Sequence, residues 1–168
     1  MAGIIFLDFY GVLLTDANAA RQSGEGLSHQ NYLSRVEFDS ACVGFFNKLL
    51  NVSGAEIVLS TSWASGNSFS TVANCLMRNG IDPTHIWEYD DPSTREWMTP
   101  RTRDDNRAGE IRTWLREHPQ VTAWCAIDDR QEIASLGPSA VVTDPTVGFS
   151  AGDLSRALGI LQKVSHRY

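Results

Sequence analysis

The chain has 168 residues, of which 42% are apolar and 20% charged, and it carries a formal net charge of −6. This length fits one domain with its own hydrophobic core, and the acidic balance argues against a broad nucleic-acid-binding surface while leaving room for a local basic cluster. No apolar run approaches the roughly 18 residues of a membrane span, and the N-terminus does not resemble a signal peptide. We therefore expect a cytoplasmic protein that makes no membrane contact.

The first half of the chain predicts two buried strands separated by a helix. Ile4–Leu7 is apolar at every position, which is typical of a strand buried on both faces. The polar segment 15–35 is expected to be a loop insertion. Asp39 is placed to cap a helix of apolar residues at helical spacing, which Gly54 ends. The second buried strand follows at 57–59.

The second half continues the alternation of strands and helices. An amphipathic helix is predicted over Phe69–Arg78, and the proline-containing segment 82–105 is expected to be a second loop insertion. The pattern predicts an α/β protein with a three-layer, Rossmann-like parallel sheet, helices on both faces and a single domain over 1–168. The remaining predicted elements are a helix over 106–119, strands over 121–130 and 139–145, and a closing helix over 153–164.

Reactive side chains stand where three of the predicted strands end. The first strand ends at Asp8, the second at Ser60–Ser62, and the third at Asp128 and Asp129. In open parallel sheets, ligands bind beyond the carboxyl ends of the strands. Carboxylates and hydroxyls are therefore expected to surround one crevice at that edge.

Several motifs in the same order resemble those of the haloacid dehalogenase (HAD) superfamily. "IIFLDFYGVL" (4–13) is similar to its first motif, an apolar strand followed by Asp-x-Asp-Gly, except at Tyr10. "IVLSTS" (57–62) resembles the second motif and "WCAIDD" (124–129) the fourth. "GEIRTWL" (109–115) resembles a helix of small members, which have been linked to RNA repair. The resemblance implies a HAD-like fold with a minimal cap or none.

The resemblance implies a phosphohydrolase, and it makes Asp8 the nucleophile that forms an aspartyl-phosphate. A carboxylate that approaches a phosphate dianion is strongly repelled. Mg²⁺ held by Asp8, the backbone carbonyl of residue 10 and Asp128 or Asp129 would cancel much of this repulsion. The expected cofactor is therefore Mg²⁺.

The second motif is expected to hold the phosphoryl oxygens through hydroxyl and backbone N–H groups. Thr61 is the first choice for the motif residue and Ser60 the second, because strand alternation leaves the register open by one position. Ser62 and Gly11 are further predicted substrate contacts.

The third motif of the superfamily normally supplies a lysine. The only lysines are Lys48 and Lys163, and neither lies between the second and fourth motifs. Arg107, at the start of a predicted helix, is the best substitute and Arg103 the next. Arginine stays charged and can bind two phosphate oxygens, so the replacement is chemically reasonable.

Segment 82–105 is also predicted to be a mobile partial lid, with Trp97 and Arg101 or Arg103 near its mouth. Capless members of the superfamily tend to act on large substrates or to rely on partners, because nothing closes over the site. The expected substrate is therefore phosphorylated and can be as large as a protein or a nucleic-acid end.

Tyr10 departs from the phosphatase pattern, which has an acid–base aspartate at this position. A phenol with an ordinary pKa near 10 is a poor acid and a poorer base at neutral pH, so about 10²–10⁴-fold in rate is expected to be missing.

Three explanations stay open: an impaired or specialised phosphohydrolase, a catalytically inactive phosphate-binding or regulatory domain, and a haloacid dehalogenase, whose first motif has tyrosine here. Halide leaves without protonation, but those enzymes carry a large cap and a lysine in the third motif.

Overall fold

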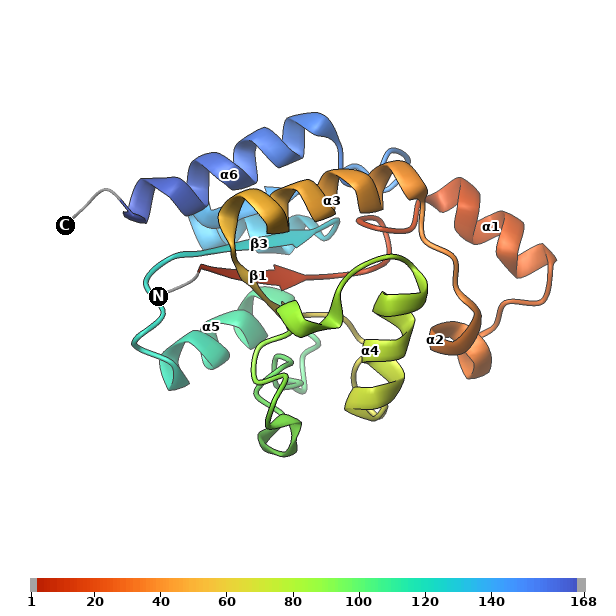
Figure 1. Cartoon of the computed structure of the whole chain (residues 1–168), viewed down its shortest axis with the longest axis horizontal. Helices are drawn as coiled ribbons and strands as arrows, with labels where there is room; N and C mark the ends of the chain where they lie inside the picture. The colour runs from red at the N-terminus through yellow and green to blue at the C-terminus, as the bar shows by residue number, and fades with distance from the viewer. Residues whose placement is uncertain (1–2, 166–168) are drawn as a thin grey trace.

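The computed structural model describes residues 3–165 and forms a parallel sheet between layers of helices (Figure 1). The strand order is β2-β1-β3-β4, so β1 lies inside the sheet between β2 and β3. The predicted three-layer α/β fold is confirmed. The ends of the predicted domain, 1–2 and 166–168, lie outside the described residues. The strands are β1 (Ile4–Leu7), β2 (Glu56–Leu59), β3 (Trp124–Asp128) and β4 (Ala140–Val142).

The sheet is buried because its two faces pack against different helices. Ile5 and Leu7 of β1 face the layer formed by α3 and α6, whereas Ile4 and Phe6 face α5 on the opposite side (Figure 1). The ring of Phe6 meets Trp114 of α5 edge-on, with 5.3 Å between centroids. The helices are α1 (Asp16–Gly24), α2 (Tyr32–Arg35), α3 (Ser40–Ser53), α4 (Phe69–Arg78), α5 (Arg107–Glu117) and α6 (Ala151–Ser165), with 3₁₀ turns η1 (His29–Asn31), η2 (Pro83–His85), η3 (Pro92–Thr94) and η4 (Gln131–Ser139).

Segment 15–35 is not the loop that was expected, because it folds into α1, η1 and α2. Thr15 caps α1, and the buried Gln22 of α1 exchanges hydrogen bonds with the backbone of Glu37, at 2.7 and 2.9 Å. Asp39 stands at the start of α3, but its carboxylate accepts from the backbone N–H of Thr15 at 2.8 Å and not from its own helix. Polar contacts hold α1 in place, so the apolar periodicity that reveals a helix in a sequence is weak here.

Segment 82–105 is less of an excursion than predicted, because part of it runs along the free edge of β2. Leu59 donates its N–H to the carbonyl of Trp97 at 2.8 Å and accepts from the N–H of Thr99 at 2.9 Å. Trp97 is buried, with 2% of its surface exposed. The prediction of Trp97 at the mouth of a lid is therefore wrong. The segment forms hydrogen bonds with backbone groups at the edge of β2. Such groups, when they are unpaired, can bind strands of other chains.

Candidate active site

Asp8 stands directly after β1, level with the ends of the two neighbouring strands. Leu7 pairs in register with the last residue of β2 and with Ile127 of β3. The N–H of Asp8 donates to the carbonyl of Ile127 at 3.1 Å, and the N–H of Ser60 donates to the carbonyl of Leu7 at 2.8 Å. The parallel register therefore brings Asp8, Ser60 and Asp128 to one edge of the sheet.

Three carboxylates meet at this edge. Asp8, Asp128 and Asp129 each offer an oxygen atom, and these atoms lie within 4.8 Å of one another. Asp8 and Asp128 are 6% and 2% exposed, and Asp129 is half-buried. A set of carboxylate oxygens suits a hard divalent cation such as Mg²⁺ or Ca²⁺. Asp8 and these two aspartates are the ligands that the sequence predicted, and the structure brings them together.

The proximity and burial of these carboxylates disfavour their charged forms. Burial raises the pKa of Asp8, and the Arg107 guanidinium, the backbone and the Thr61 hydroxyl oppose the rise through charge and hydrogen bonding. Burial and the negative charge of Asp8 raise the pKa of Asp128 to about 8. The guanidinium groups of Arg107 and Arg130 therefore leave the cluster short of positive charge, which a bound cation would supply.

Arg107 is the positive partner of this cluster. It is the first residue of α5, it is 1% exposed, and its Nε donates to Asp128 Oδ2 at 3.1 Å. One of its terminal nitrogens donates to the carboxylate of Glu110 at 3.0 Å. Asn106 caps the helix by accepting from the N–H of Gly109, and this fixes the position from which the Arg107 side chain starts. Of the two arginines suggested by the sequence, Arg107 lies in the site.

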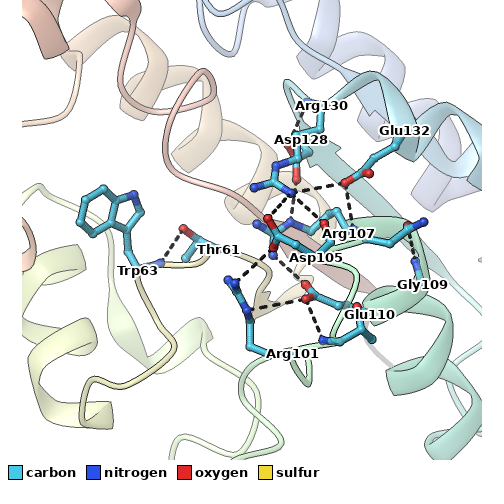
Figure 2. Close-up of polar contacts among 12 residues, drawn as sticks. Thr61, Trp63, Arg101, Asp105, Arg107, Gly109, Glu110, Asp128, Arg130 and Glu132 are labelled. Atoms are coloured by element: carbon cyan, nitrogen blue, oxygen red, sulfur yellow. Dashed lines mark hydrogen bonds and ion pairs between the residues drawn. The ribbon is translucent and has the colours of Figure 1, made fainter. Parts of the chain in front are cut away.

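Glu110 was not predicted as a site residue, although it is completely buried in the contact with Arg107. Its second oxygen accepts from the N–H of Thr102 at 3.1 Å and lies 3.8 Å from Arg101 (Figure 2). The spacing of Arg107 and Glu110, one helical turn apart, was a usable signal. The outer contacts gave no such signal: Arg130 contacts Asp105, which is 25 residues away in the sequence, and also Glu132.

The hydroxyls of the second motif differ in their surroundings. Thr61 is buried, interacts with Asp8, and accepts from the backbone N–H of Trp63 at 3.3 Å. The Ser60 hydroxyl is buried and has no hydrogen-bond partner within the described residues. Ser62 is exposed to solvent. Thr61 and Ser60 therefore both lie beside Asp8, and Ser60 has an unused donor there.

Gly11 is required by a close approach of two chain segments. Its φ is +73°, and a Cβ at this position would stand 2.5 Å from the Asp129 carboxyl carbon. The Gly11 carbonyl also accepts from the Thr143 hydroxyl of the loop after β4, at 2.7 Å. Only glycine allows Asp129 to remain where it is.

Tyr10 points its hydroxyl toward α1. The side chain is 39% exposed, and its hydroxyl donates to the Asp16 carboxylate at 2.9 Å. This hydrogen bond is the main cause that raises the pKa of Tyr10. Tyr10 therefore keeps its proton at neutral pH.

Arg103 is exposed, and its side chain makes no hydrogen bond or ion pair with the described residues.

Comparison with known families places the chain among HAD domains. Residues 4–154 match the family described as "HAD domain in Swiss Army Knife RNA repair proteins". The chain belongs to this family. The comparisons with curated proteins and with solved structures gave no match. In the described part of this HAD domain, none of the helices has the length and apolar character needed to cross a bilayer.

Proposed function

We propose that this HAD domain is a Mg²⁺-dependent phosphohydrolase that removes a phosphate group from an RNA end, with Asp8 as the nucleophile. The observation that supports this most is the meeting of Asp8, Asp128 and Asp129 beside Thr61 and Arg107. The family description supports RNA as the substrate class, because it concerns RNA repair proteins.

The proposed first step is attack of an Asp8 carboxylate oxygen on phosphorus. An oxygen–phosphorus bond forms to Asp8, the ester bond breaks, and the RNA hydroxyl leaves and takes up a proton. Mg²⁺ bound by Asp8, Asp128 and Asp129 would offset the repulsion between the carboxylates and the phosphate. The fit of this cation rests on the all-oxygen cluster and on the raised pKa of both buried carboxyls.

The neighbouring side chains hold the phosphoryl group and the nucleophile. The Ser60 hydroxyl is unpartnered, so it can donate to a phosphoryl oxygen without losing another bond. The Thr61 hydroxyl interacts with Asp8 and orients it. Arg107 is already bound to Asp128 and Glu110, so its main role in this proposal is to balance the charge of the carboxylates.

The second step, attack of water on the aspartyl-phosphate, needs a base that Tyr10 does not provide. Its hydroxyl proton is bound to Asp16, and its pKa is raised. General-base catalysis typically contributes about 10²–10⁴-fold in rate, so hydrolysis of the intermediate should be slow. A substrate with a good leaving group should then give a burst of product before steady turnover.

The test uses p-nitrophenyl phosphate and RNA oligonucleotides with a 5′- or a 3′-phosphate, each with Mg²⁺ and with EDTA. We expect Mg²⁺-dependent release of phosphate from one RNA series and a nitrophenolate burst of about one per site. Asp8→Asn should abolish both, whereas Asp90→Asn, at an exposed aspartate outside the carboxylate cluster, should leave both unchanged. Turnover that survives Asp8→Asn would exclude Asp8 as the nucleophile.

Two alternative functions predict different results. A non-catalytic phosphate-binding domain binds Mg²⁺ or phosphate in calorimetry and turns over none of these substrates. A dehalogenase releases chloride from 2-chloropropionate without metal. The cluster of three carboxylates favours phosphate chemistry over dehalogenation, because a departing halide needs no such cation site.

A further inference from the structure

A cavity lined by aromatic side chains lies against the loops that follow β1 and β2, which also carry Asp8 and Thr61. Its volume is about 150 Å³, and four of the residues that line it are aromatic. The rings of Tyr32 and Trp63 are stacked, with 3.6 Å between centroids, and the centroid of the His29 ring lies 4.7 Å from that of Trp63. Tyr10 and His29 have exposed side chains, so the cavity opens to solvent. These residues come from the loop after β1, from η1 and α2, and from the loop after β2.

The chain connects this cavity to the reacting centre. Tyr10 is two residues beyond Asp8, and Trp63 is two residues beyond Thr61, whose hydroxyl accepts from the Trp63 N–H at 3.3 Å. In Figure 2, Thr61 and Trp63 lie apart from the network around Arg107 and Arg101. A group bound in the cavity and attached to a phosphate at Asp8 would therefore lie away from this network.

One polar group in the cavity wall has no partner. Tyr32 is 4% exposed, and its hydroxyl makes no hydrogen bond within the described residues. Burial is the main cause that raises the pKa of Tyr32, and the negative charge of Asp8 is the next. A buried hydroxyl without a partner is costly unless a ligand or water satisfies it.

We propose that this cavity binds the nucleobase of the terminal nucleotide whose phosphate lies at Asp8. This inference rests on the proposed function, because it names the part of the RNA end that is recognised. A cavity of roughly this volume accommodates one aromatic ring, and aromatic side chains stack on any base. The Tyr32 hydroxyl would donate a hydrogen bond to an acceptor on the edge of the base. The ring of a phosphotyrosine has no such acceptor, so this contact would favour RNA over a phosphopeptide. The Tyr10 ring, held through Asp16, would form part of the stacking surface.

The experiment compares binding of RNA with and without the terminal base. Oligonucleotides with a 5′- or a 3′-phosphate are made with a normal or an abasic terminal nucleotide, and their Kd values are measured in EDTA. Loss of the base should weaken binding by about 5- to 150-fold in one of the two series. Tyr10→Ala should reduce this ratio toward one, and Tyr10→Phe, which keeps the ring, should retain most of it. His29→Ala provides a second variant at an exposed position.

Three results would overturn the inference. The first is equal binding of normal and abasic RNA by the wild-type chain. The second is a preference for the base that persists in both Tyr10→Ala and His29→Ala. The third is tighter binding of a phosphotyrosine peptide than of RNA. Turnover of p-nitrophenyl phosphate is measured in parallel: activity without base preference refutes this inference alone, and base preference without activity refutes the proposed hydrolase alone.

Discussion

Replacing Arg107 with methionine should destabilise the protein strongly, because two buried carboxyl groups would lose the guanidinium that is hydrogen-bonded to both. Arg107 is 1% exposed, and it donates to Asp128 at 3.1 Å and to Glu110 at 3.0 Å. Each hydrogen bond to a charged group contributes about 1.5–3 kcal/mol, and removal of one partner from a buried ion pair costs about 3–5 kcal/mol. We expect a loss of about 3–5 kcal/mol, or a fall in Tm of about 6–20 °C for a chain of this size.

The loss should also depend on pH in a defined direction. Folding raises the pKa of Asp128 from 3.8 to about 8, so this carboxyl stabilises the fold most at low pH, and its contribution is lost as the pH rises through 8. Arg107 lowers this pKa, so its removal raises the pKa further. The destabilisation should therefore be greater at pH 8 than at pH 5.5.

The measurement is urea unfolding in EDTA at both pH values, with Arg116→Met as the control. Arg116 is exposed on the same helix, and its replacement should change stability by less than about 0.5 kcal/mol. A loss below 1 kcal/mol for Arg107→Met at pH 8, or a loss that is larger at pH 5.5, would refute this reasoning.

Three further results are expected. Asp8→Asn should stabilise the metal-free protein at pH 8 by about 1–3 kcal/mol in urea unfolding, because it removes a buried carboxylate from the cluster; a loss of stability would contradict this. Mg²⁺ at about 100 times its Kd should add about 2.7 kcal/mol to the wild-type protein and much less to Asp128→Asn, and equal gains would exclude a site at Asp128. Gly11→Ala should lower stability by about 2–4 kcal/mol and weaken Mg²⁺ binding, since a Cβ would displace Asp129. Gly54→Ala is the control, because Gly54 also has a positive φ but has open space around it. This control should lower stability by only about 1–2 kcal/mol and leave Mg²⁺ affinity unchanged.

The predictable parts of the fold were those with periodic apolar patterns. Ile4–Leu7 and Phe69–Arg78 begin and end where the sequence indicated. Helix α1 was missed because polar contacts such as that of Gln22 hold it, and such contacts leave no period in the sequence. Trp97 was misplaced because its burial depends on pairing with the edge of β2, which lies about 40 residues earlier in the chain.

The site shows the same division between local and distant information. Strand ends and parallel topology sufficed to predict the meeting of Asp8 with Asp128 and Asp129. Glu110 was overlooked although it is one turn from Arg107, because a glutamate near a helix start is usually solvated. The aromatic cavity was not predictable, since it depends on how α2 folds against the loop that contains Trp63.

The charge balance of the site suggests why a tyrosine suits position 10. The described cluster already holds three carboxylates near the guanidinium groups of Arg107 and Arg130, and the pKa values of Asp8 and Asp128 are still both raised. A fourth carboxylate at position 10 would add repulsion that only a bound cation could offset. Tyr10 avoids this repulsion and directs its hydroxyl to Asp16, which lies outside the cluster. The same change removes the expected acid–base group and places an aromatic ring in the wall of the cavity. Under the proposed function, this would slow hydrolysis and strengthen recognition of the base.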